Sequence, residues 1–221
     1  VGAIPINKTC FMLLLYHIRI ILSSCSQLGC LVKLEELMKK AFLFLANGFE
    51  DVEALTPIDY LRRAGIDLIT VGVEGKAVIS SHKVPITCDI VLEEAVQNEE
   101  ELIAVILPGG LPNSSTLAGS EAVREFAKKT LASGGIAAAI CAAPALALGS
   151  WGILEGKNYT CYPGMGQDLS TKPKAGERVI RDGNIITACA AGAAEEFAFA
   201  IVEAICGKTA LNKLKTEVVA R

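Results

Sequence analysis

Histidine and closely paired cysteines are scarce in this chain of 221 residues. It has only two histidines, His17 and His82, and none of its eight cysteines forms a C-x-x-C pair. Structural zinc sites are built from close pairs of these residues, so the sequence argues against a metal site. Scattered cysteines without a pairing pattern are typical of reduced thiols in a cytoplasmic protein rather than of a disulfide framework.

The chain also lacks an excess of basic residues and a clean membrane span. Its formal net charge is −3, which argues against nucleic acid as a partner. The apolar stretch from Phe11 to Val32 contains His17 and Arg19, and an arginine is costly inside a bilayer. No small-residue cleavage site follows this stretch. We therefore expect neither a nucleic-acid nor a membrane partner.

Residues 1–37 differ in character from the rest of the chain. The preferred interpretation is that Met38 is the natural start and that 1–37 is an N-terminal extension outside the natural domain. A signal anchor is the alternative. Residues 38–221 have the length of one domain, and 52% hydrophobic residues supply one sizeable core.

From residue 41 onward, short apolar runs alternate with helical patterns. Such alternation predicts an α/β fold, a mainly parallel sheet with helices on both faces. The expected strands are 41–46, 67–73, 102–107, 136–140 and a short one at 159–162; the expected hairpins are 77–88 and 178–187; the expected helices are 51–64, 121–132, 193–206 and a short one at the end of the chain.

Cys141 follows one of these buried strands directly. The next helix begins at once, with Pro144 in its first turn, where a missing N–H costs nothing. This strand–cysteine–helix order is that of a nucleophile elbow, and N–H groups at a helix N-terminus favour a thiolate. The alternative is that Cys141 is a small buried hydrophobic residue.

Three loops at the carboxyl ends of predicted strands carry unusual residues. In parallel sheets ligands bind at this edge. One loop has Glu50 and Glu53 at a helix start, the second has Gly109 and Gly110, and the third has Cys141. Taken singly, the acids could serve only the helix dipole and the glycines only a turn. Together they supply a nucleophile, an acid and backbone donors for addition to a carbonyl.

Several motifs, in this order, carry a family resemblance: Gly48-Phe49-Glu50-Asp51-Val52-Glu53, Leu107-Pro108-Gly109-Gly110, Ala138-Ala139-Ile140-Cys141-Ala142-Ala143-Pro144 and Glu196-Phe197-Ala198-Phe199-Ala200. Over residues 39–210 the chain resembles the ThiJ/PfpI superfamily, in the branch of the Parkinsonism-associated protein deglycase. The resemblance implies a flavodoxin-like sandwich, usually a homodimer, that needs no cofactor. It also implies a reactive Cys141 hydrogen-bonded to a protonated Glu53, with Gly109 and Gly110 as backbone donors.

The chain departs from the family at several positions. Tyr162 stands where a histidine is often found, and Ala142 stands where the proteases of the family have one. No histidine follows His82, so neither a Cys–His protease nor a glutamine amidotransferase is expected. His82 matches an arginine that in some relatives reaches toward the pocket. We expect Ala142, Glu50, Tyr162 and His82 to line the substrate or oxyanion site.

In the loop before the C-terminal helix, Cys189 and Ala191 replace an arginine and a proline of the family. Cys161 and Cys189 are on loops expected near Cys141, so a resolving disulfide is one open possibility.

Three functions fit these residues. The first is an enzyme of the glyoxalase III or deglycase type, acting on small dicarbonyls or early glycation adducts. The second is a redox-sensing stress protein or chaperone that uses the same oxidisable cysteine without turnover. The third is a binding or assembly domain that retained the fold and lost the chemistry.

Overall fold

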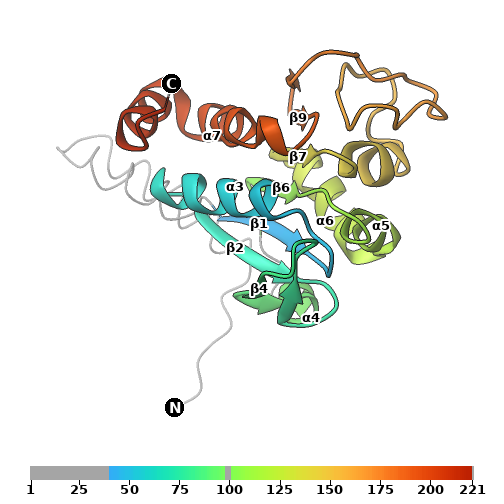
Figure 1. Ribbon diagram of the computed structural model, residues 1–221, viewed down its shortest axis with the longest axis horizontal. Helices are drawn as coiled ribbons and strands as arrows, with labels where there is room; N and C mark the ends of the chain where they lie inside the picture. The colour runs from blue at the N-terminus through green and yellow to red at the C-terminus, as the bar shows by residue number, and fades with distance from the viewer. Residues whose placement is uncertain (1–39, 98–100, 221) are drawn as a thin grey trace, which may run out of the picture. The chain divides into compact units, whose positions relative to one another are not determined.

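The computed structural model describes residues 40–97 and 101–220, so the interpretation of residues 1–37 lies outside it. The described part contains a seven-stranded sheet with the order β5-β2-β1-β6-β7-β9-β8 (Figure 1). Neighbouring strands are parallel except for β8, which is antiparallel to β9. The strands are β1 (Lys40–Leu45), β2 (Asp67–Gly72), β5 (Ile90–Val91), β6 (Ala104–Leu107), β7 (Ile136–Ile140), β8 (Val179–Asp182) and β9 (Ile185–Ala188).

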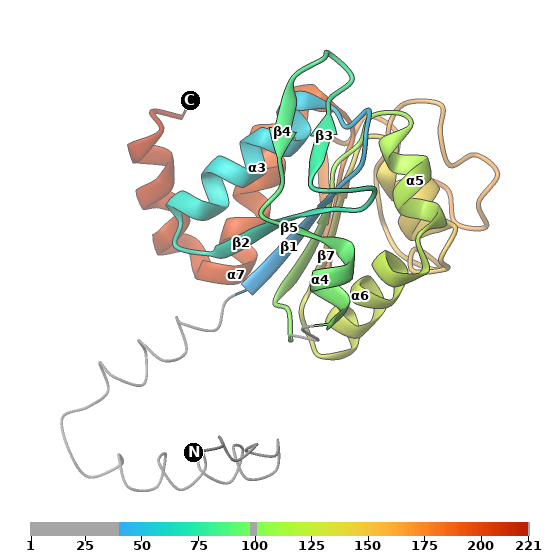
Figure 2. The same ribbon diagram turned by 90° about the horizontal axis from the view of Figure 1, so that it is seen from below.

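Helices cover both faces of this sheet (Figure 2). On one face lie α3 (Asp51–Arg63) and α7 (Ala194–Glu217), with the short η3 (Ala191–Ala193) before α7. The other face is covered by α4 (Leu92–Gln97), α6 (Glu121–Ala132) and η2 (Pro144–Gly149), with α5 (Asn113–Gly119) beside η2. A separate hairpin of β3 (Ala77–Ile79) and β4 (Pro85–Thr87) lies beside the start of α3. The predicted flavodoxin-like α/β architecture is confirmed.

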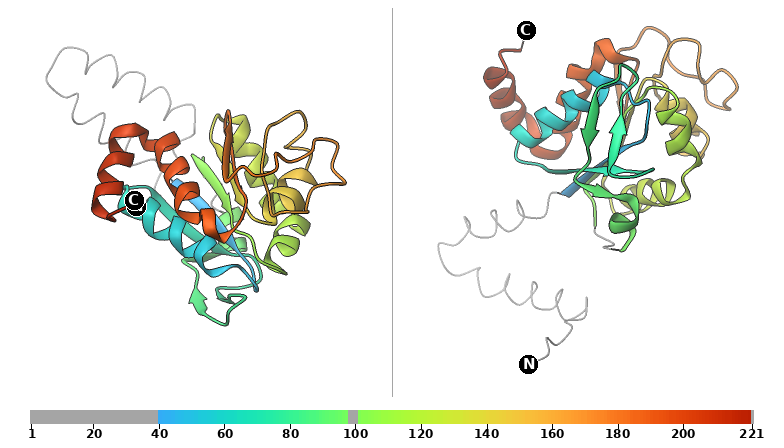
Figure 3. Two further views of the ribbon diagram at one scale, coloured as in Figure 1. Left: turned by 45° about the horizontal axis from the view of Figure 1, so that its top comes forward. Right: turned by 60° about the horizontal axis from the view of Figure 1, so that its bottom comes forward.

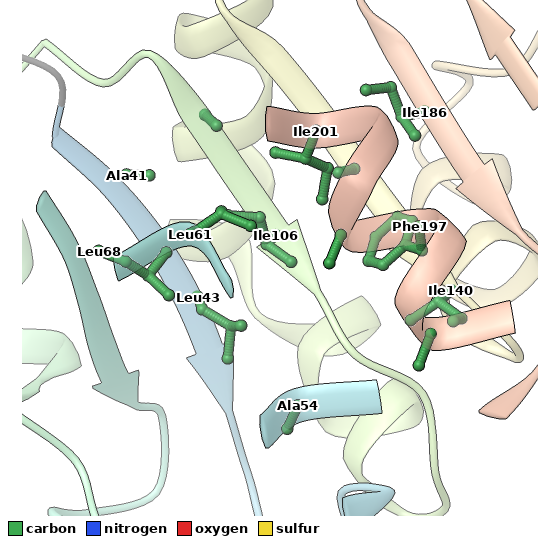
Figure 4. Close-up of a cluster of buried hydrophobic side chains, with 14 of the residues drawn as sticks. Ala41, Leu43, Ala54, Leu61, Leu68, Ile106, Ile140, Ile186, Phe197 and Ile201 are labelled. Carbon is green, nitrogen blue, oxygen red and sulfur yellow. The ribbon is translucent and has the colours of Figure 1, made fainter. Parts of the chain in front are cut away.

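The central strands β1, β6 and β7 are apolar at nearly every position because both faces of the sheet are buried there. In β1, Leu43 packs under α3 and α7, whereas Phe42 and Phe44 pack on the opposite side with Phe126 of α6. Figure 4 shows the first of these two clusters, in which Leu61 of α3 and Phe197 of α7 meet the sheet. Alternate residues of one strand therefore serve two different cores.

Helix boundaries follow local capping chemistry. Glu50 caps α3 by accepting a hydrogen bond from the Glu53 N–H, and Ser120 caps α6 in the same way through Val123. The expected helix at 193–206 and the expected short final helix follow one another directly as α7. The non-helical backbone of Gly207 (φ 80°) marks the kink between them. None of the helices in residues 40–97 and 101–220 combines the length and the apolar character that crossing a membrane requires.

The structure differs from the expected elements in two places. Residues 159–162 do not form a strand: the Thr160 N–H donates to the Thr187 hydroxyl, and the Tyr162 N–H donates to the Cys141 carbonyl. This backbone is therefore satisfied by irregular contacts, and the chain continues through the long loop before β8 (Figure 3). The sequence analysis also missed β5, α4 and α5.

The strand order indicates at which edge of the sheet a ligand would bind. With the two-residue edge strand β5 left out of the count, the parallel strands β2-β1-β6-β7-β9 have the flavodoxin order 2-1-3-4-5. The order reverses between β1 and β6, and ligands of such sheets bind outside the carboxyl ends of the strands at this point. The loops after β1, β6 and β7 are the three that carry Glu50 and Glu53, Gly109 and Gly110, and Cys141.

Candidate active site at the carboxyl edge of the sheet

Cys141 is held in an unusual backbone conformation directly after β7. Its φ is 64°, in the left-handed region that non-glycine residues seldom adopt. The Cys141 N–H donates to Ala188 (2.9 Å), and its carbonyl accepts from Tyr162 (2.7 Å). Such strain persists when the surroundings fix the residue from both sides, and it is common at functional sites. The predicted elbow is therefore present, with Pro144 in the first turn of η2.

Glu53 brings a buried carboxyl group to the same place. It lies in the first turn of α3 with no exposed surface, and its Oε2 accepts the Gly109 N–H at 3.0 Å. Its Oε1 is buried and has no hydrogen-bond partner within donor–acceptor distance. Burial, together with the nearby charge of Glu50, raises the pKa of Glu53 to about 7. The side chain can therefore gain and lose a proton near neutral pH.

The Cys141 thiol and the Glu53 carboxyl interact strongly. Burial, the charge of Glu53 and a hydrogen bond to Glu53 raise the pKa of Cys141 to about 12, although the N–H groups of Gly110 and Ala142 act in the opposite direction. The elbow donors thus favour the thiolate, as expected, but burial beside a carboxylate outweighs them. At neutral pH and above, one proton is shared by this pair.

The two glycines after β6 have different tasks. A Cβ on Gly109 would lie 2.4 Å from Glu53 Oε2 and 2.5 Å from the Cys141 Cβ, so only glycine allows the acid and the thiol to meet there. The Gly109 N–H is already donated to Glu53 and does not fit the predicted oxyanion role. The Gly110 N–H and the Ala142 N–H are directed at the sulfur.

Asn113 positions this loop, and the sequence analysis missed it. Its side chain is fully buried; Oδ1 accepts the Ala46 N–H (2.7 Å), and Nδ2 donates to the carbonyls of Pro108 (2.8 Å) and Gly109 (3.0 Å). One amide thus joins the loop after β1 to the loop after β6. An asparagine shortly after Gly-Gly gives no pattern that distinguishes this role from a helix start.

The remaining predicted residues lie around the pair. Glu50 approaches Glu53 through the helix cap and through its charge. The Tyr162 N–H donates a hydrogen bond to the Cys141 carbonyl, and the Tyr162 side chain is exposed. His82 is exposed and pairs with Asp51, 2.8 Å from Nδ1 to Oδ2. Its predicted place in the substrate site therefore remains a prediction.

Among the described residues, one group of side chains has the composition and spacing of possible metal ligands. Atoms of Glu50, Asp51 and His82 lie within 4.8 Å of one another. The carboxylates of Glu50 and Asp51 already accept hydrogen bonds, from the Glu53 N–H and from Ser80. This group is explained as the capped start of α3.

Several known proteins are similar to this chain in sequence and fold. The DJ-1/PfpI family matches residues 39–204. Protein DJ-1 homolog B of Arabidopsis thaliana is 40% identical over 172 residues, 77% of this chain, and the chain spans only 39% of that relative's length. A Pyrococcus abyssi protein named as a deglycase is 29% identical over 150 residues, 67% of this chain and 88% of the relative. The crystal structure of Drosophila melanogaster DJ-1beta superposes with a TM-score of 0.77 at 35% identity, covering 83% of this chain and 98% of that one. The chain belongs to the DJ-1/PfpI family.

Proposed function

We propose that the protein is a cofactor-independent enzyme that converts small dicarbonyls, or early glycation adducts, through covalent catalysis by Cys141. The observation that carries this proposal is the buried pair of Cys141 and Glu53, in which the acid has a pKa of about 7. A general base whose pKa is near the working pH is suited to accept the thiol proton. The archaeal relative named as a deglycase supports the reaction class.

In the first step the Cys141 sulfur adds to the aldehyde carbon of methylglyoxal. A C–S bond forms, the thiol proton passes to Glu53, and the carbonyl oxygen becomes an alkoxide. The N–H groups of Gly110 and Ala142, which are directed at the sulfur, are close to where this oxygen develops. Proton return from Glu53 then gives a neutral hemithioacetal.

In the second step Glu53 moves a proton between adjacent carbons. As a carboxylate it removes the proton from the former aldehyde carbon, giving an enediolate. The protonated Glu53 then donates this proton to the neighbouring carbon, while the hydroxyl proton on the former aldehyde carbon passes to the neighbouring oxygen. The product is a thioester of lactate on Cys141. Water then cleaves the C–S bond, releasing lactate and the thiol. An early glycation adduct already carries the amine on the former aldehyde carbon, so it would enter by substitution: the C–S bond forms, the C–N bond breaks, and the thiol proton leaves with the amine.

The test is lactate formation from methylglyoxal by the full chain, beside Cys141→Ser and Glu53→Gln. Many equivalents of lactate per protein, lost in both variants, would support the enzyme. The exposed Glu203→Gln on α7 is the matched control and should retain wild-type turnover. Alkylation of the wild type once, without further turnover, would refute the proposal.

A redox or chaperone role is the second candidate, and the unpartnered Oε1 of Glu53 favours it. In the protonated acid this oxygen could donate a hydrogen bond to an oxidised Cys141. A sensor would be modified once per molecule. Turnover of methylglyoxal therefore separates the two functions. An assembly domain without chemistry would show neither turnover nor selective oxidation of Cys141.

We also propose that the protein forms a homodimer through exposed apolar residues on α3 and the adjoining hairpin. Val52 and Leu55 of α3 and Ile79 and Val84 of the hairpin region are each 40–49% exposed. The two elements are joined by Ser80, which donates to Asp51 at 2.6 Å. A second copy of the chain would cover this patch. Light scattering should give a dimer for the wild type and a monomer for Val52→Asp, whereas Val96→Asp on the distant α4 should remain dimeric.

A further inference from the structure

Cys189 directly follows β9 at the end nearest Cys141, and the proposed reaction gives it no role. The register pairs Ile140 of β7 with Ala188 of β9, and the Cys141 N–H donates to Ala188. Cys141 and Cys189 are therefore the residues that directly follow this pair at the ends of two neighbouring strands. Such strands lie about 4.8 Å apart, and a disulfide joins Cα atoms that are about 4.4 to 6.8 Å apart.

Both side chains lie on the same side of the sheet. Cys141 and Cys189 are half-buried, and each packs against the cluster between the sheet and the helices α3 and α7. Both are free thiols. The left-handed backbone of Cys141 turns its side chain onto the face that holds Glu53. Both cysteines therefore lie on the side of the sheet that α3 and α7 cover.

Cys161 precedes Tyr162, whose N–H donates to the Cys141 carbonyl, but Cys161 lies on the opposite face of the sheet from Cys141. Its sulfur is directed at the carbonyls of Tyr162 (3.6 Å) and Met165 (3.4 Å), within the cluster on the opposite face of the sheet. Burial raises the pKa of Cys161 to about 11. It is therefore a poor attacking thiol.

Cys189 has a cationic neighbour. Its N–H donates to the Arg178 carbonyl at 2.9 Å. The pKa of the Arg178 guanidinium is raised chiefly by its hydrogen bond to Glu196, and the charge of Cys189 adds to this effect. The Arg178 guanidinium thus places a positive charge near Cys189. Attack on an oxidised sulfur proceeds from a thiolate.

We propose that Cys189 is a resolving cysteine that converts oxidised Cys141 into a reversible disulfide. A hydroperoxide first oxidises the Cys141 sulfur to a sulfenic acid and is itself reduced to water or an alcohol. The Cys189 thiolate then attacks that sulfur; an S–S bond forms, the S–O bond breaks, and the hydroxide takes a proton to leave as water. An external thiol restores both cysteines. The disulfide would protect Cys141 from irreversible oxidation while switching off the site.

This inference rests on the reactivity of Cys141 that the proposed function also uses, but it does not require turnover. The reduced full chain would be treated with a few equivalents of hydrogen peroxide, alkylated, and digested with trypsin without reductant. Mass spectrometry should find peptides 130–157 and 182–208, which contain Cys141 and Cys189, joined by a disulfide that dithiothreitol cleaves. Peptide 182–208 also contains Cys206.

Matched variants decide which cysteine takes part. The joined peptides should persist in Cys206→Ser and Cys161→Ser and disappear in Cys189→Ser, which should instead accumulate sulfinic acid at Cys141. The inference is overturned if the wild type forms no such linkage, if the linkage survives in Cys189→Ser, or if both proteins form equal sulfinic acid.

Activity gives a separate readout. Without peroxide, Cys189→Ser should turn over methylglyoxal as the wild type does. After peroxide, dithiothreitol should restore turnover in the wild type only. If the reduced wild type has no turnover but forms the disulfide, the proposed function fails while this inference stands. If it turns over but forms no disulfide, the reverse holds.

Discussion

The raised pKa of Glu53 predicts that a variant lacking this acid is more stable than the wild type in alkaline solution. Glu53 is fully buried, and its pKa rises from 4.5 to about 7 on folding. A carboxyl group whose folded pKa is raised stabilises the protein fully below its unfolded pKa. That stabilisation is lost as the pH rises through the folded value.

The magnitude follows from the two pKa values. At about 1.4 kcal/mol per pKa unit, the difference corresponds to about 3 kcal/mol of unfolding free energy lost between acidic and alkaline pH. Glu53→Gln keeps an oxygen that accepts the Gly109 N–H and places an amide where Oε1 has no partner. Gln does not ionise. The variant should therefore match the wild type below about pH 4 and exceed it by up to about 3 kcal/mol near about pH 9.

Urea unfolding of the reduced proteins at several pH values measures this difference. Glu203→Gln, which removes an exposed carboxylate from α7, is the control and should follow the wild type throughout. The reasoning is refuted if the Glu53→Gln and wild-type stabilities differ by the same amount at every pH, because Glu53 would then not titrate in this range.

Three further outcomes are expected from the same site. The wild-type kcat/KM for methylglyoxal should rise with pH through about 7, because Glu53 accepts the thiol proton only when ionised; a flat profile would contradict this. Gly109→Ala should abolish turnover and destabilise the protein by about 1–3 kcal/mol, because its Cβ would overlap Glu53 and Cys141. The control Gly119→Ala, whose Cβ would meet nothing within 4 Å, should leave both properties unchanged. Urea unfolding and lactate assays measure the two effects. Asn113→Ala should lower the unfolding free energy by about 2 kcal/mol or more and reduce kcat, since the Ala46 N–H and the Pro108 carbonyl lose their side-chain partner and the Gly109 carbonyl keeps only the Glu50 N–H; unchanged stability would refute its positioning role.

The fold was predictable because its strands are apolar on both faces. A run such as residues 136–140 can be buried throughout only between two layers of helices, and the capping residues Glu50 and Ser120 mark the helix starts. The missed α5 has the opposite character. Its sequence, Asn113–Gly119, is rich in small polar residues and shows no apolar period, so its helix depends on tertiary contacts with η2.

The members of the site were predictable, but the allocation of its hydrogen bonds was not. The sequence indicated that Glu53, Gly109 and Cys141 would meet at one edge of the sheet. It did not reveal that the Gly109 N–H is occupied by Glu53, or that burial dominates the pKa of the thiol. Both depend on distances of about a hydrogen-bond length between segments far apart in the chain, and a residue pattern does not encode such distances.

The raised thiol pKa is compatible with a reactive Cys141 once the charge of the whole pair is counted. At neutral pH and above, Glu53 and Cys141 together carry one negative charge and one proton. When sulfur adds to an uncharged aldehyde, the proton moves to Glu53 and the charge moves to the developing oxygen. The buried site therefore holds a single charge before, during and after the addition, and no second charge has to be desolvated. A thiolate formed independently of Glu53 would be a second negative charge in the same buried space, and burial together with the charge of Glu53 raises the pKa of Cys141 to about 12. Proton transfer within the pair is thus the step on which the nucleophilicity of Cys141 depends.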